Sequence, residues 1–224
     1  MISAVVRHLV IKEWDLCKPQ IIFTVLGGEL ALALSQWGTE PAMVVGTIWF
    51  FVSLMLVACM LPLGSIVNER KNQTLAFVMS LPISPIEYSA AKLIANLGMF
   101  LIPWVTLVCA ALLVIETRGI IPRGVIPLTL VLAFLPFVGF CIITATALVG
   151  ETEGWGIAAN VVVNTSYGLV WYFMTRVPAL MAGANKPAPV WNSTVVTVLA
   201  GEFVLVVLIL GVTFFLQSLK RDFV

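Results

Sequence analysis

The chain has 224 residues, of which 61% are hydrophobic and 10% are charged, and its mean hydropathy is +1.09. Soluble domains are apolar over about half of their residues, so this composition predicts an integral membrane protein. The formal net charge of +1 and the lack of a basic cluster give no indication of nucleic-acid binding. The four cysteines stand singly, without CxxC or Cys/His spacing, so neither a metal site nor a disulfide framework is indicated.

Residues 1–18 favour an amphipathic helix, because apolar residues recur at helical spacing and most charged residues fall on the other side. This segment is too short and too charged to cross a membrane. We therefore expect it to lie at the membrane interface, with Trp14 at the head-group boundary. Glu13 and Asp15, together with the lack of a small-residue cleavage site, argue against a cleaved signal peptide.

Six apolar runs follow, each long enough for a hydrocarbon core that about 20 helical residues cross. We expect spans near residues 19–37, 42–67, 93–115, 125–149, 156–177 and 194–217. The predicted fold is therefore an all-α integral membrane protein with six transmembrane helices in a single domain over residues 1–224. Interior prolines such as Pro103 and Pro136 are tolerable there, because neighbouring helices satisfy the freed backbone groups.

A polar stretch, NERKNQTLAFVMSLPISPIEYSAAK, occupies residues 68–92 between the second and third runs. Its apolar centre, LAFVMSL, is followed by Pro82 and Pro85, which end any helix. We interpret the stretch as a short coupling helix that docks onto a soluble partner, since a plain loop has no use for an apolar run. The alternative is a solvated loop that only links two spans.

The same stretch resembles the first cytoplasmic loop of permeases of exporter-type (ABC-2) ATP-binding-cassette transporters. The resemblance rests on Glu69, Arg70, Thr74, Leu75, Leu81, Pro82, Ser84, Glu87 and Lys92. It implies a permease subunit, paired in the lipid membrane with a second copy or a homologous permease and powered by a separate cytoplasmic ATPase that binds ATP and Mg. It also implies that Lys71, Phe77 and Glu151 contribute to coupling with the ATPase, Glu151 from a second cytoplasmic turn.

Basic residues favour one orientation in the membrane. Cytoplasmic ends of the predicted spans would hold Arg7, Lys12, Lys18, Arg70, Lys71, Lys92, Lys220 and Arg221, and the outer ends only Arg118, Arg123, Arg176 and Lys186. The positive-inside rule therefore predicts a multi-pass protein of the inner (cytoplasmic) membrane, with both termini and residues 68–92 in the cytoplasm.

No enzyme signature is present in the sequence. GxxxxGK[ST] is missing, so if ATP drives this protein, the ATPase is a separate polypeptide. HExxH and GxSxG are missing too, and the single histidine cannot form a His pair. We expect no catalytic residue, no metal and no cofactor on this chain. Two alternatives remain: a six-span substrate-binding or channel protein working without ATP hydrolysis, and a membrane-embedded hydrolase.

Two carboxylates, Glu29 and Glu202, fall inside predicted spans. Intramembrane acids are costly, so both are candidates for binding a cationic substrate group or lining a wet cavity. The structural alternative is a protonated carboxyl that hydrogen-bonds a neighbouring helix.

The fifth predicted span has one polar face, formed by Asn160, Asn164, Tyr167 and Trp171 at helical spacing. This face is a candidate lining of the substrate pathway. It is at least as well suited to hydrogen bonding between helices, which Asn side chains commonly provide inside membranes.

Overall fold

The computed structural model of the protein describes residues 4–71, 85–150 and 152–219. Over these ranges it contains helices and no strands, which confirms the all-α prediction. The elements are α1 (Ala4–Ser35), α2 (Glu40–Pro62), the π-helix η1 (Leu63–Val67), α3 (Asn68–Lys71), α5 (Pro85–Arg118), the 3-10 helix η2 (Arg123–Val125), α6 (Ile126–Val149), α7 (Glu153–Arg176), α8 (Pro178–Met181) and α9 (Ser193–Leu219).

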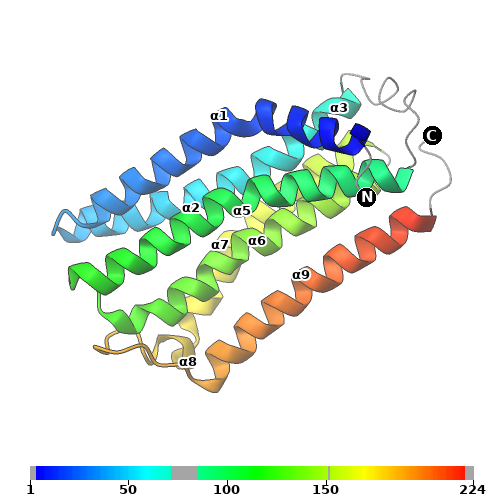
Figure 1. Ribbon diagram of the computed structural model, residues 1–224. Coiled ribbons are helices and arrows are strands. Elements are labelled where there is room, and N and C mark those ends of the chain that lie inside the picture. Colours follow the sequence, from blue (N-terminus) through cyan, green and yellow to red (C-terminus); the bar gives the residue numbers. More distant parts are fainter. Residues whose placement is uncertain (1–3, 72–84, 151, 220–224) are drawn as a thin grey trace.

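The long helices form a bundle in which the chain runs back and forth between two ends (Figure 1). We call these the α3 end and the α8 end, after the short helix that lies at each. The start of α1 and the end of α9 both lie at the α3 end. α1 packs against α2 and α5, whereas α6 packs against α2, α7 and α9, so α6 occupies the centre.

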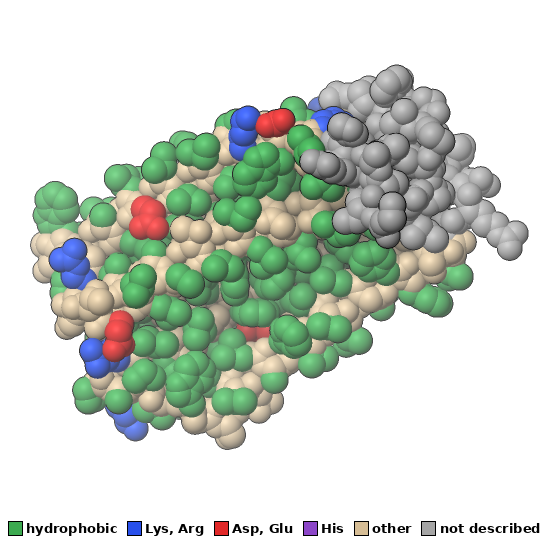
Figure 2. All heavy atoms as spheres, viewed as in Figure 1, with side chains coloured by type: hydrophobic (Ala, Val, Ile, Leu, Met, Phe, Trp, Pro, Cys, Tyr) green, Lys and Arg blue, Asp and Glu red, His purple; other side chains and the backbone are tan. Residues whose placement is uncertain are grey.

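Among the described residues, five helices are long and apolar enough to cross a membrane. They cover Val10–Ser35, Glu40–Val67, Tyr88–Arg118, Arg123–Val149 and Ser193–Leu219. Hydrophobic side chains cover most of the face seen in Figure 2, which suits a surface in contact with lipid. The structure therefore supports a multi-pass membrane protein.

The sixth predicted span, residues 156–177, corresponds to α7, which is not among the five candidates. With 24 residues, α7 is about 36 Å long and matches the thickness of a bilayer. Its apolar residues are interrupted by Asn160, Asn164, Thr165 and Ser166, which lower its hydropathy. Length alone therefore does not confirm a sixth crossing.

The N-terminal segment differs from the prediction. We expected an interfacial helix over residues 1–18 and a separate span from residue 19, but α1 runs without interruption through Pro19. The candidate span begins earlier, at Val10. Pro19 has no N–H to donate to the carbonyl of Asp15, which is a usual cause of a bend, and Figure 1 shows the axis of α1 bending in its first half.

Close contact between α1 and α2 depends on Gly46. A Cβ atom at this position would lie 2.6 Å from the carbonyl oxygen of Ala31 and 2.6 Å from the backbone nitrogen of Ser35. Only glycine lets the two backbones approach this closely. The contact fixes the angle at which the two helices meet at the α8 end.

Candidate functional site

Four charged side chains from three helices meet inside the α3 end. They are Lys12 and Glu13 of α1, Glu69 of α3 and Lys92 of α5, and we call them the ion network. Glu13 and Lys92 are each 2% exposed and Glu69 is 8% exposed. Buried charges of this kind are tolerated when they are paired and hydrogen-bonded.

Lys92 is the centre of the ion network. Its Nζ lies 2.7 Å from Glu13 Oε1, 2.9 Å from Glu69 Oε2 and 2.8 Å from the backbone carbonyl oxygen of Ser65. An ammonium has three N–H donors, and here three acceptors surround it. Ser65 belongs to the π-helix η1, a type of distortion that often occurs at functional sites. One side chain therefore joins α1, η1, α3 and α5.

Glu69 accepts from two further donors. Lys12 Nζ lies 2.8 Å from Glu69 Oε1, and the Tyr88 hydroxyl donates to Glu69 Oε2 at 3.0 Å. Burial by itself would raise the pKa of Glu69, but the positive charges of Lys92 and Lys12 outweigh it and lower the pKa. Glu69 is therefore ionised at neutral pH.

Uncharged hydrogen bonds extend the ion network. Asn96 lies one helical turn after Lys92 and is fully buried. Its Nδ2 donates to Ser65 Oγ at 2.8 Å and to the Lys92 carbonyl at 2.9 Å. Gln217 of α9 accepts from Ser89 Oγ at 3.2 Å and donates to a carbonyl of α6 at 2.7 Å. The start of α5 is therefore tied to the last turns of α6 and α9.

The sequence predicted two of the four network members, Glu69 and Lys92, and the structure brings them together. Lys71 is exposed. The other predicted coupling positions, Thr74, Leu75, Phe77, Leu81, Pro82, Ser84 and Glu151, lie outside the described residues, as do the side chains of Arg70 and Glu87.

Sequence reasoning missed Lys12 and Glu13 as site residues. A signal for Glu13 was present: it lies four residues before Cys17, which lies four residues before Ile21, and all three are buried. Side chains at this spacing share one face of a helix. An acid within an apolar stripe implies a buried partner.

The predicted pathway residues do not converge on one site. Glu29 is exposed on α1, whereas Glu202 of α9 is 7% exposed and neither carboxylate oxygen has a hydrogen-bond partner among the described residues. Glu202 is close enough to Tyr167 to interact with it electrostatically. Trp171 lies at the α8 end, with its ring 4.6 Å from that of Phe51.

The polar face of α7 makes hydrogen bonds with its neighbours. Asn164 Nδ2 donates to Asn160 Oδ1 at 2.9 Å and contacts Cys59 Sγ of α2 at 3.0 Å. The Tyr167 hydroxyl donates to the carbonyl of Leu132 at 3.2 Å. That carbonyl has no helical N–H partner four residues on, because Pro136 occupies that position. These contacts favour the helix-packing interpretation of this face.

Within the described ranges, no group of three or more His, Cys, Asp or Glu side chains is placed to hold a metal ion. Cys17, Cys59 and Cys141 are buried free thiols, and Cys109 is an exposed one. Comparisons of the chain with protein-family models, with curated protein sequences and with solved structures found no match.

Proposed function

We propose that this chain is the transmembrane permease subunit of an ATP-driven transporter of the exporter type, and that residues 68–92 bind a separate cytoplasmic ATPase carrying ATP and Mg. One observation carries the proposal: the ion network joins the described residues on the two sides of the segment 72–84. Glu69 precedes this segment, Lys92 follows it, and the two are joined at 2.9 Å.

Anchoring of this kind transmits force. On α1, Lys12 binds Glu69 and Glu13 binds Lys92. Lys92 also donates to the carbonyl of Ser65, which connects the end of the second span to the same network. A displacement of the segment 72–84 by a partner therefore moves α1, α2 and α5 together. Buried ion pairs add little net stability, yet losing one partner is costly, so they suit a role in fixing positions.

In the proposed topology the α3 end is cytoplasmic and α7 is the sixth crossing. α7 runs alongside α6 and returns the chain to the α8 end (Figure 1). An even number of crossings places the start of α1 and the end of α9 on one side of the membrane. The basic residues on that side satisfy the positive-inside rule.

Glu29 supports pairing with a second copy or a homologous permease. Lys18 and Asp15 form an exposed ion pair at 2.9 Å, and in the proposed topology this pair lies at the level of the lipid head groups. Glu29 is exposed about 16 Å further along the helix, near the middle of a hydrocarbon core of about 30 Å. An acid facing lipid at that depth is costly, so a protein partner that covers this face is favoured.

Co-purification tests the proposal. The tagged protein is extracted from its native membranes, and whatever accompanies it is identified by mass spectrometry. We expect a stoichiometric ATPase with a P-loop motif, which Leu75→Asp releases. The matched control is Ile120→Asp, because Ile120 is an exposed apolar residue at the α8 end and its replacement is expected to leave the ATPase bound.

A protein that purifies without any ATPase contradicts the proposal and favours the substrate-binding or channel alternative. Retention of the ATPase by both variants, or its loss from both, contradicts docking through residues 68–92.

A further inference from the structure

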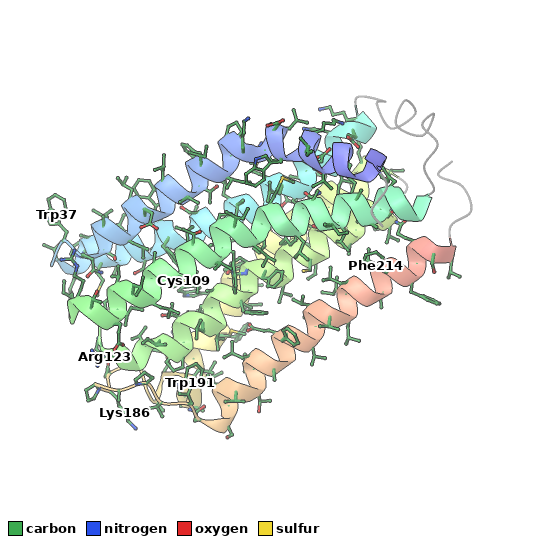
Figure 3. All side chains as sticks on the ribbon, viewed as in Figure 1. Trp37, Cys109, Arg123, Lys186, Trp191 and Phe214 are labelled. Atoms are coloured by element: carbon green, nitrogen blue, oxygen red, sulfur yellow. The ribbon has the colours of Figure 1, made fainter. Side chains whose placement is uncertain are left out.

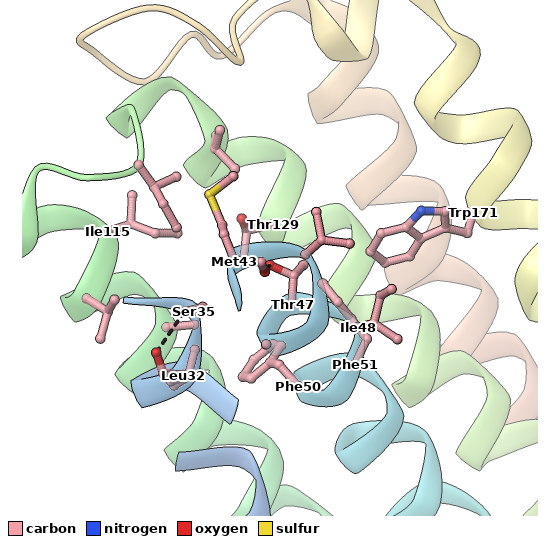
Figure 4. A pocket seen from close by; sticks show the side chains of 16 residues that line it. Leu32, Ser35, Met43, Thr47, Ile48, Phe50, Phe51, Ile115, Thr129 and Trp171 are labelled. Atoms are coloured by element: carbon pink, nitrogen blue, oxygen red, sulfur yellow. Dashed lines mark hydrogen bonds between the residues drawn. The ribbon is translucent and has the colours of Figure 1, made fainter. Parts of the chain in front are cut away.

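A cavity of about 430 Å³ lies between α1, α2, α5, α6 and α7 at the α8 end, far from the ion network (Figure 4). Its walls include Leu32, Phe50, Phe51, Ile115 and Trp171. The volume falls within the range of small-molecule sites, about 300–1,000 Å³. Side chains that line an unfilled cavity lose their van der Waals contacts on that side, so a space of this size favours an occupant.

The cavity walls select an apolar occupant. None of the described residues that line the cavity is charged. The described lining residues carry three hydroxyls, those of Ser35, Thr47 and Thr129. Ser35 Oγ donates to the Leu32 carbonyl at 2.7 Å and Thr47 Oγ1 donates to the Met43 carbonyl at 2.8 Å. Two of the three donors are therefore engaged within their own helices, and a polar ligand would recover few of the hydrogen bonds to water that it loses on entry.

The cavity opens toward the lipid side of the bundle. Two of its lining residues, Val44 and Ile48 of α2, are 53% and 58% exposed. Both lie in a candidate membrane span, Glu40–Val67, so this rim of the cavity faces hydrocarbon. A molecule entering past these side chains comes from the bilayer itself.

Positive charge lies at the outer end of the same cavity. Ile121 and Val125 line the cavity, and Arg123 lies between them, with its Cα within about 7 Å of each of theirs. Arg123 projects from the α8 end (Figure 3), and Arg118 ends α5 nearby in sequence. Arg123 Nη2 lies 3.1 Å from the Glu116 carboxylate and donates to the Glu116 backbone carbonyl at 3.2 Å, but both side chains are about half exposed, and a surface ion pair of this kind is weak.

From these observations we infer that the cavity binds one acyl chain of an anionic membrane phospholipid, whose phosphate lies beside Arg123. The hydrocarbon chain fills the largely apolar space between α1, α2, α5, α6 and α7, and the head group stays at the membrane surface. This site does not depend on the proposed ATPase, so it can be tested on the purified chain.

The test uses the full chain in nanodiscs of phosphatidylcholine that contain a small fraction of phosphatidylglycerol with a diazirine at the end of one acyl chain. After irradiation, mass spectrometry locates the label. We expect label on cavity-lining peptides around Phe51 and Trp171. Thr47→Phe fills the cavity and is expected to reduce this label at least fivefold. Thr165→Phe is the matched control, because Thr165 is exposed on α7 and its replacement leaves the label unchanged.

Val114→Phe fills the same space from α5 and repeats the test if Thr47→Phe does not fold. Equal labelling of the wild type and a folded cavity-filling variant overturns the inference. So does label spread evenly over outward-facing residues of all helices. For the head group, Arg123→Gln is expected to lower labelling by phosphatidylglycerol about fivefold and to leave labelling by a phosphatidylcholine probe unchanged. No difference between the two lipids overturns the role of Arg123.

Discussion

Replacing Lys92 by methionine removes the charge at the centre of the ion network and keeps most of the side-chain volume. Glu13 and Glu69 then lose an ammonium that lies 2.7 and 2.9 Å from them, and Glu13 is almost fully buried. Breaking a buried ion pair by removing one partner costs about 3–5 kcal/mol, because the remaining charge is uncompensated. We expect Lys92→Met to lower the free energy of unfolding by this amount.

Thermal unfolding in detergent, followed by tryptophan fluorescence, measures the effect. For a chain of this size, about 2–4 °C per kcal/mol predicts a fall in Tm of about 6–20 °C. Lys186→Met is the matched control, because Lys186 is exposed at the α8 end and is expected to change stability by less than about 0.5 kcal/mol.

A double-mutant cycle isolates the Lys92–Glu13 contact. Glu13→Gln in the Lys92→Met background is expected to cost less than Glu13→Gln alone, with a coupling energy of about 1–3 kcal/mol. A Tm for Lys92→Met equal to that of Lys186→Met, or a coupling energy near zero, would refute the assignment of Lys92 as the centre of the network.

Three further predictions concern stability. Because the pKa of Glu69 is lowered in the folded protein, its contribution to stability is fully present above about pH 4.5, the ordinary pKa of the group, and is lost as the pH falls through the lower folded value. When Tm is measured at decreasing pH, the fall in Tm should therefore be smaller for Glu69→Gln than for the wild type. Gly46→Val places side-chain atoms against the Ala31 carbonyl and should lower the free energy of unfolding by about 1–3 kcal/mol, measured by thermal unfolding. Gly98→Val is the control and should lower it by less, because the space around Gly98 is open. Tyr167→Phe removes one hydrogen bond to α6 and should lower unfolding free energy by about 0.5–1.5 kcal/mol, and no change would contradict that bond.

The five long apolar helices of the bundle were predictable from the sequence, because a helix that crosses a bilayer needs about 20 consecutive apolar residues. The same signal predicted a span at residues 156–177. The structure has a long helix there, α7, but does not confirm a crossing, because Asn160 and Asn164 lower the hydropathy of this helix. The continuity of α1 was not predictable. Pro19 usually marks a boundary, but tertiary packing of Cys17 and Ile21 on both sides of it holds one helix together.

The candidate site was predictable only in part. The motif around residues 68–92 drew attention to Glu69 and Lys92, but pairing them with Glu13 requires the packing of α1 against α5. The cavity left no signal in any local stretch, because its walls come from helices far apart in the sequence. Leu32, Phe51 and Trp171 each look like ordinary apolar residues of a span until the helices are assembled.

The backbone hydrogen bonds of the π-helical segment Leu63–Val67 join residues five apart, one more than in the α-helix that it continues. In an α-helix each residue turns the chain by about 100°, so deleting one residue here would rotate α3 by roughly that angle relative to α2. The carboxylate of Glu69 would then point away from Lys92. The position of Glu69 relative to Lys92 thus depends on the length of this π-helical segment, and a one-residue deletion there would be harsher than most substitutions.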